Sequence, residues 1–100
     1  MFKEFYDEVK KVPFGRVTTY GRVACLAGYP RCAKFVGWAL HSNSEPNTTA
    51  CHRVVKKDGS LSEAFAFGGV VAHAALLKAE GIEIDEENYR VKNLEKVLYP

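Results

Sequence analysis

The sequence predicts a mainly α-helical fold with short β segments, organised as a single helix-turn-helix, winged-helix-like domain over residues 1–100. Three observations predict it. One hundred residues suffice for one modest hydrophobic core and are too few for two. Apolar residues recur at three- and four-residue steps in several segments, which is typical of amphipathic helices. Two of these helical segments are joined by the tight turn Gly28-Tyr29-Pro30, whereas only short stretches near 54–55 and 82–91 favour strands.

The three cysteines indicate reduced thiols rather than a disulfide framework or a metal site. Cys25, Cys32 and Cys51 make an odd count without Cys-x-x-Cys spacing, and Cys25 is expected to pack in the helix core. The first residues form a charged amphipathic stretch instead of an apolar signal core, and no run is long enough to span a bilayer. We therefore expect a cytoplasmic protein.

The net charge of +2 conceals an uneven distribution along the chain. Residues 10–57 contain nine Lys and Arg residues against Glu45 alone, whereas the flanking segments are acidic. A basic central segment indicates a face that binds phosphates. A solvated surface on which these charges mix with acidic neighbours explains the same count equally well.

A first helix is predicted over residues 2–11, because the aromatic and valine residues up to Val12 fall on one stripe. Pro13 and Gly15 end it. A short extended link follows, and Thr19 is placed to cap the next helix at its N-terminus.

A helix-turn-helix is predicted at about 19–41. Its first helix covers 20–27 and its second covers 31–41. The second helix of such a motif normally lies against DNA, and here Arg31 and Lys34 share one of its faces. A plain helical hairpin within a small core is the alternative that the pattern leaves open.

The segment 49–55 carries the candidate chemistry. It places a thiol, an imidazole and a guanidinium in a row at Cys51, His52 and Arg53, ahead of two valines. A free thiol is only a few per cent ionised near pH 7, and a neighbouring base or cation increases the thiolate fraction. Because consecutive side chains diverge, His52 is expected to reach Cys51 through a bridging water or a bend. A buried structural cysteine beside a surface His-Arg pair is the alternative.

The second half begins with an aromatic loop, 61–69, which either packs on the core or walls an apolar pocket beside the cysteine. A helix over 70–80 follows, and its expected inner stripe is Val71, Ala75, Leu76 and Ala79. Glu80 stands at the end of this helix, where the helix dipole disfavours a carboxylate, so a compensating partner is expected. Ile82 and Ile84 alternate with polar residues and are expected to pair with 89–91 in a hairpin. The last residues are expected to form a short helix or docked segment.

Several motifs occur in an order and at a spacing known from one protein family. They are Val12-Pro13-Phe14-Gly15-Arg16-Val17-Thr18-Thr19-Tyr20-Gly21, Ala27-Gly28-Tyr29-Pro30, Val36-Gly37, Asn43, Ala50-Cys51-His52-Arg53-Val54-Val55 and Glu80-Gly81. In these residues the chain resembles the catalytic domain of the O6-alkylguanine-DNA alkyltransferases. It looks most like the alkyltransferase-like sub-branch, because it lacks an extra N-terminal domain and has a long loop at 61–69. Well-known members of that sub-branch replace the nucleophilic cysteine, whereas this chain retains Cys51.

The resemblance implies an alkyltransferase DNA-binding domain that enters the minor groove of double-stranded DNA and flips O6-alkylguanine into a pocket. The alkyl group is then transferred irreversibly to the cysteine. The implied catalytic residues are Cys51, His52, Glu80, Tyr20 and Asn43. Among them, His52 takes the thiol proton through water and is held by Glu80, Tyr20 donates a proton to the leaving base, and Asn43 braces the turn. The implied DNA-binding residues are Thr19, Tyr20, Arg22, Arg31, Cys32, Ala33, Lys34 and Arg53. The implied pocket residues are Val54, Leu61, Ser62, Phe65, Phe67 and Gly68.

Two departures from the family pattern leave open whether Cys51 is active, and three functions are considered. Ala50 replaces a proline that stiffens the turn, and Lys34 replaces an arginine that fills the space left by the flipped base. The first function is a single-turnover methylated-DNA–protein-cysteine S-methyltransferase. The second is a sensor that binds the lesion without repairing it and flags it for nucleotide excision repair proteins. A helix-turn-helix regulator that flips no base is a third. The resemblance implies no cofactor and no metal, and a monomer is expected.

Overall fold

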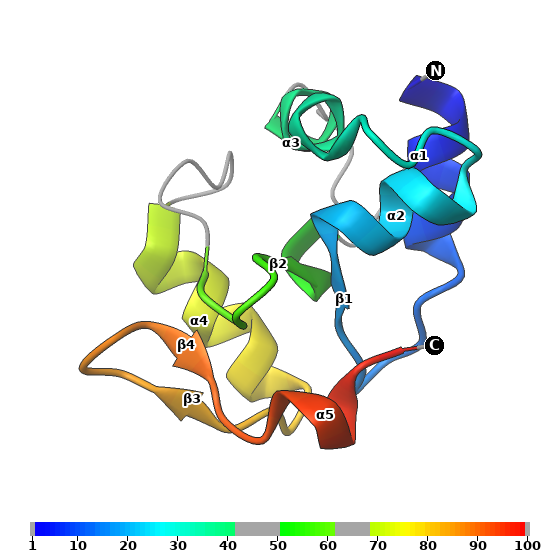
Figure 1. Cartoon of the computed structure of the whole chain (residues 1–100). Coiled ribbons are helices and arrows are strands. Elements are labelled where there is room, and N and C mark those ends of the chain that lie inside the picture. Colours follow the sequence, from blue (N-terminus) through cyan, green and yellow to red (C-terminus); the bar gives the residue numbers. More distant parts are fainter. Residues whose placement is uncertain (1, 42–50, 62–68, 100) are drawn as a thin grey trace.

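The computed structural model describes residues 2–41, 51–61 and 69–99. Its elements are α1 (Phe2–Lys10), β1 (Thr18–Thr19), α2 (Tyr20–Leu26), α3 (Ala33–His41), the 3-10 helix η1 (Cys51–Arg53), β2 (Val54–Val55), α4 (Gly69–Ala79), β3 (Ile84–Asp85), β4 (Arg90–Val91) and α5 (Leu94–Val97). Figure 1 shows α1, α2 and α3 on one side and α4 with the β3–β4 hairpin on the other, with β1 and β2 between them. The predicted fold class, mainly helical with short strands, is confirmed. None of the described helices is both long and apolar enough to cross a membrane.

Within residues 2–41, three helices pack together. α1 buries Phe5 and Val9 completely, as the predicted stripe requires. Thr19 is the N-cap of α2, because its hydroxyl accepts a hydrogen bond from the backbone N–H of Arg22 at 3.2 Å. α2 and α3 pack against each other and against α1. The two packed helices predicted at about 19–41 are therefore present, joined by a turn.

Two details of this half differ from the prediction. α3 begins at Ala33 rather than at residue 31, because a turn closed by the Cys32 N–H on the Tyr29 carbonyl at 2.9 Å comes first. Cys25 is exposed rather than packed in the core. The residues that α2 buries are Val23 and Ala24, and a rotation of about 100° per residue turns the next side chain toward solvent.

β2 lies between two hydrophobic clusters. It pairs in parallel with β1, with Thr18 opposite Val54 and Thr19 opposite Val55. Val54 packs with residues of α1, α2 and α3, whereas Val55 packs with residues of α4 and the β3–β4 hairpin. Successive side chains of a strand point to opposite faces, so two adjacent valines join both halves of the core. The end of η1 is thereby anchored on both sides.

The predicted inner stripe of α4 is wrong. The four residues expected inside, Val71, Ala75, Leu76 and Ala79, are exposed. The helix instead buries His73, Ala74 and Leu77. The residues of α4 itself are apolar on almost every face of the helix. Hydrophobic periodicity therefore does not define which face turns inward. The predicted hairpin after this helix is confirmed, since β3 and β4 pair antiparallel with Ile84 opposite Val91.

The C-terminal segment docks against the start of the helix-turn-helix. After α5 the chain forms a parallel bridge to the backbone just before β1. The Arg16 guanidinium donates a hydrogen bond to the carbonyl of Lys96, and Nε of Arg22 donates to the carbonyl of Tyr99 at 3.1 Å. The predicted docked tail is therefore present, and it engages two arginines of the basic central segment.

Candidate functional site

η1 carries the Cys-His-Arg sequence at the junction of the two halves. It is a single 3-10 turn, Cys51–Arg53, that leads directly into the buried strand β2. The backbone of Cys51 belongs to this turn, while its side chain lies outside the described part of the structure. α4 packs against the turn from the other side. His52 and Arg53 are therefore held between β2 and α4.

Glu80 lies against His52, as the resemblance implies. Oε2 of Glu80 is 2.5 Å from Nε2 of His52, and only 6% and 16% of the two side chains, respectively, are exposed. A carboxylate accepts hydrogen bonds, so the proton between these atoms belongs to Nε2 of the imidazole. Donation from Nε2 leaves Nδ1 of a neutral imidazole as a proton acceptor. This contact therefore leaves Nδ1 of a neutral His52 able to accept a proton.

Two more donors hold the Glu80 carboxylate. Nε of Arg53 donates to both of its oxygens, at 2.9 and 3.0 Å, and the backbone N–H of Gly15 donates to Oε1 at 2.9 Å. Burial raises the pKa of Glu80, but the hydrogen bonds from Arg53, Gly15 and His52 outweigh it, so the pKa lies below its ordinary value. The carboxylate therefore stays ionised at neutral pH. These three donors are the compensation that a carboxylate at a helix end requires.

Arg53 extends the network toward the loop after α1. Its Nη1 donates to the carbonyl of Val12 at 2.9 Å, and its guanidinium lies 5.9 Å from the centre of the Phe14 ring. The sequence predicts a DNA contact for Arg53. In the structure this guanidinium binds Glu80 and Val12, so a structural role in the site is observed and the DNA contact stays a prediction.

Two glycines shape the backbone around Glu80. Gly15 and Gly81 have φ angles of +82° and +84°, in the left-handed region that favours glycine. Gly81 follows Glu80 and ends the helix, since its N–H donates to the Lys78 carbonyl at 2.9 Å. Gly15 brings its own N–H to the carboxylate. The Pro-Phe-Gly motif therefore serves the site as well as ending α1.

His73 is a buried residue of this site that the sequence analysis did not identify. Its side chain has no exposed surface, and its Nε2 lies 2.7 Å from the backbone carbonyl oxygen of His52. The carbonyl only accepts, so Nε2 of His73 carries the proton. Burial lowers the pKa of His73 to about 4, although the hydrogen bond to His52 opposes this shift. Neutral His73 thus fixes the backbone of η1. The sequence feature that could have identified this residue is its position as a lone histidine in the apolar segment 70–77.

The outward face of α3 carries cationic and aromatic side chains. Arg31 and Lys34, two of the predicted DNA contacts, are exposed, and Nζ of Lys34 lies 5.1 Å from the centre of the Trp38 ring. The half-buried members of the predicted set are Thr19, Tyr20, Arg22, Cys32 and Ala33. Of these, Tyr20 and Cys32 pack against the N-terminal cluster. The DNA-binding roles of all these residues stay predictions.

The predicted substrate pocket is described only in part. Val54 and Leu61 are buried in the two core clusters. The other predicted pocket residues, Ser62, Phe65, Phe67 and Gly68, lie outside the described residues, as does the predicted catalytic residue Asn43.

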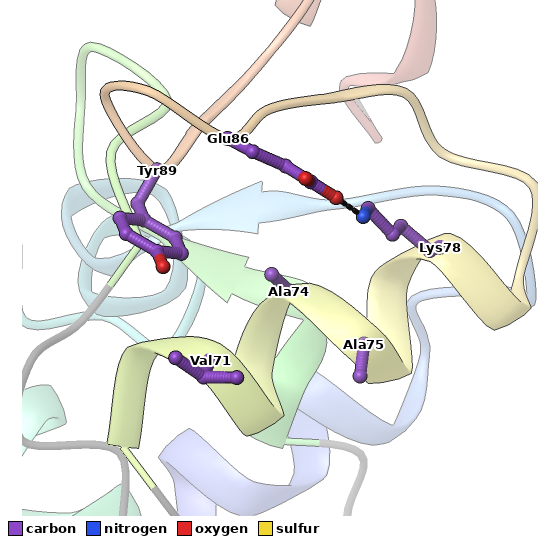
Figure 2. A pocket seen from close by; sticks show the side chains of 6 residues that line it. All are labelled: Val71, Ala74, Ala75, Lys78, Glu86 and Tyr89. Carbon is purple, nitrogen blue, oxygen red and sulfur yellow. Dashed lines mark ion pairs between the residues drawn. The ribbon is translucent and has the colours of Figure 1, made fainter.

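A pocket of about 210 Å³ lies elsewhere, between α4 and the β3–β4 hairpin. Figure 2 shows its lining, in which Lys78 of α4 forms an ion pair with Glu86 of the hairpin. No predicted site residue lines this pocket. Within residues 2–41, 51–61 and 69–99, no group of three or more His, Cys, Asp and Glu side chains could hold a metal ion.

The fold and the site together define a helix-turn-helix domain in which a Cys-His-Arg turn is bound to the carboxylate at the end of the following long helix. Residues 1–82 match the family model of the 6-O-methylguanine DNA methyltransferase DNA binding domain. The chain belongs to this family, as the resemblance indicated.

The chain is similar to methyltransferases and to proteins named for base flipping or as alkyltransferase-like. The rat methylated-DNA–protein-cysteine methyltransferase is 40% identical over 74 residues, which are 74% of this chain and 35% of that protein. A DNA base-flipping protein of Escherichia coli is 40% identical over 88 residues, covering 82% of this chain and 67% of that protein. The crystal structure of S. pombe Atl1 in complex with damaged DNA containing O6-carboxymethylguanine superposes with a TM-score of 0.87, at 28% identity, over 99% of this chain and 94% of that chain. The chain thus spans about a third of the length of the rat enzyme.

Proposed function

We propose that the chain binds double-stranded DNA through α2 and α3, takes an O6-alkylguanine out of the base stack and transfers its alkyl group to Cys51. The observation that carries this proposal is the contact of His52 with a buried, ionised Glu80 at 2.5 Å. A base oriented by a carboxylate beside a potential nucleophile is the arrangement that activates thiols and hydroxyls in many enzymes. A purely structural cysteine needs neither the base nor the carboxylate.

The transfer balances without a cofactor. Nδ1 of His52, through a water molecule, takes the proton of the Cys51 thiol, and the sulfur attacks the alkyl carbon of the lesion. The S–C bond forms as the bond from carbon to O6 breaks, and the electron pair of that bond goes to the guanine. Tyr20 donates a proton to the guanine, so that the guanine leaves as a neutral base. The proton that His52 took from the thiol then restores the proton of Tyr20. The thioether product is stable, so each molecule reacts once.

The DNA partner is supported by the named relatives and by the surface of α3. The S. pombe structure contains damaged DNA, and the E. coli relative is named for base flipping. Flipping costs a few kcal/mol of pairing and stacking, and a lesion that already weakens its base pair lowers that cost. Lys34, on the helix that would meet the phosphates, and Arg31, just before that helix, are both exposed.

The test is the intact mass of the chain after incubation with a duplex that holds one O6-methylguanine. We expect a gain of one methylene mass, located in the Cys51 peptide, and no gain for Cys51→Ala. Cys25→Ala is the matched control, because it removes an exposed cysteine of α2 and should still accept the methyl group. A gain that persists in Cys51→Ala, or no gain in the unaltered chain, contradicts alkyl transfer to Cys51.

A sensor that binds the lesion without repairing it is the second candidate. The superposition on the S. pombe Atl1 complex over 99% of the chain favours it, as do Ala50 and Lys34 at positions where the family pattern has proline and arginine. Selective binding of the lesion duplex without any gain in mass would establish this function. Its partners would then be sought among nucleotide excision repair proteins.

A further inference from the structure

The outward face of α3 holds an aromatic pair that the transfer reaction does not use. The rings of Phe35 and Trp38 meet edge to face, with their centres 4.9 Å apart and their planes at 88°. The two residues are 37% and 50% exposed, respectively. Two adjacent aromatic rings at the surface form an apolar patch, and such patches are typical of binding surfaces.

Trp38 lies against a cationic side chain, and two further basic residues flank its helix. Lys34 lies over its ring at 5.1 Å, Arg31 precedes the helix and His41 ends it, and all three are exposed. Positions 34, 38 and 41 fall on one line of the helix, because steps of three and four residues return to the same face. The residues that α3 buries, Val36, Ala39 and Leu40, lie on the opposite side.

This combination suits a ligand that is both anionic and aromatic. Proteins that bind unstacked bases combine a positively charged surface with aromatic rings on which the bases stack. A flexible ammonium such as that of Lys34 offers a point charge and no flat surface. The indole of Trp38 lies directly under that ammonium and supplies the flat surface.

We propose that Trp38, braced by Phe35, stacks on a DNA base at the lesion and acts with Lys34 to fill the space that the extruded guanine leaves. This inference rests on the proposed function of α3 in DNA binding. The arginine that the family pattern has at position 34 would offer a flat guanidinium, which Lys34 lacks. The proposal gives this role of a flat contact to the neighbouring Trp38. Lys34 would supply the charge and Trp38 the stacking.

Trp38 is the only tryptophan in the chain, so its fluorescence reports the contact directly. The full chain is titrated with a duplex that holds one O6-methylguanine and with the undamaged duplex of the same sequence. We expect quenching of the Trp38 emission by the lesion duplex. Trp38→Ala should lower the affinity for this duplex about 5- to 100-fold, and Trp38→Phe should recover part of the loss. Leu76→Ala is the matched control, because it truncates another exposed apolar side chain, on α4, and should leave the affinity unchanged.

The salt dependence of the affinity distinguishes a stacking contribution from a charge contribution. Because stacking releases no counterions, Trp38→Ala should lower the affinity by the same factor at low and high salt, whereas the effect of Lys34→Ala should shrink as salt rises. Far-UV circular dichroism verifies that each variant is folded. An affinity of Trp38→Ala within twofold of the unaltered chain overturns the proposal while the proposed function stands. Failure of the unaltered chain to prefer the lesion duplex overturns the proposed function, and this inference with it.

Discussion

Nε2 of His52 and Oε2 of Glu80 lie 2.5 Å apart although 28 positions separate the two residues in the chain. The imidazole belongs to η1 and the carboxylate follows α4, so their contact joins the turn that contains Cys51 to the end of the helix packed against it. An ionised carboxylate on Nε2 leaves Nδ1 unprotonated in the neutral ring. The chemistry proposed for the thiol depends on this one tautomer.

Glu80→Gln tests that dependence, because it keeps the size of the side chain and removes its charge. We expect the rate of methyl transfer to Cys51 to fall about 10²-fold, since the base loses its orienting carboxylate. Single-turnover kinetics with the O6-methylguanine duplex measure the rate. Glu83→Gln is the control, because it makes the same change at an exposed carboxylate three residues away and should leave the rate unaltered. Equal rates for Glu80→Gln and the unaltered chain would refute the proposed role.

His73 should make the stability of the fold depend on pH. Its pKa is about 4 in the folded chain, against an ordinary value of 6.5, because it is buried. Between these values the unfolded chain binds a proton that the folded chain does not, so stability present above pH 6.5 is lost as the pH falls toward 4. The full shift corresponds to about 3 kcal/mol, at about 1.4 kcal/mol per pKa unit.

His73→Gln should flatten this part of the pH dependence. Glutamine keeps an N–H donor for the carbonyl of His52 but does not titrate. Urea denaturation at several pH values between 4 and 6.5 measures the free energy of unfolding. His41→Gln, which removes an exposed histidine of α3, should keep the steep dependence of the unaltered chain. The interpretation fails if the unaltered chain and His73→Gln lose stability in parallel.

The features that the sequence could predict are those that depend on a few neighbouring residues. Thr19 as an N-cap depends on the three residues that follow it, and Glu80 at a helix end signals by itself that a partner is needed. Both predictions are confirmed by contacts in the structure. The three donors to Glu80, in contrast, come from two separate places in the chain, the loop after α1 and η1, and only packing brings them together.

Two contacts that packing creates were not indicated by the sequence. The N–H of Gly15 meets a carboxylate 65 positions away, and His73 meets a carbonyl 21 positions away. The residues next to Gly15 and His73 in the sequence do not indicate which group either one will contact. The resemblance implies a DNA contact for Arg53, whereas the structure pairs its guanidinium with Glu80. Charge patterning does not distinguish an exposed guanidinium from one that is paired inside the fold.

Gly15→Ala should destabilise the fold through its backbone. The φ angle of +82° costs an L-residue about 1–2 kcal/mol, whereas the added Cβ would lie 3.6 Å from the Glu80 carbonyl oxygen, an ordinary contact. We therefore expect the free energy of unfolding to fall by about 1–2 kcal/mol in urea denaturation. Gly21→Ala is the control, because Gly21 lies in α2 with open space around its Cα, and alanine there should stabilise by about 0.5–1 kcal/mol. Effects of the same sign at both glycines would contradict the conformational explanation.

The affinity for DNA should fall steeply with salt, through Lys34 of α3 and Arg31 just before this helix. Each phosphate contact contributes about 0.9 to the slope of log affinity against log salt, so Arg31→Ala and Lys34→Ala should each reduce that slope by about 1. Arg16 and Arg22 already donate to backbone carbonyls of the C-terminal segment, but a guanidinium has five N–H groups, so these donations leave others for phosphate. Lys92→Ala, in the acidic C-terminal part of the chain, is the control and should leave the slope unchanged. A slope that stays the same in Arg31→Ala and Lys34→Ala would show that α3 does not meet the phosphates and would move the DNA-binding face to another part of the molecule.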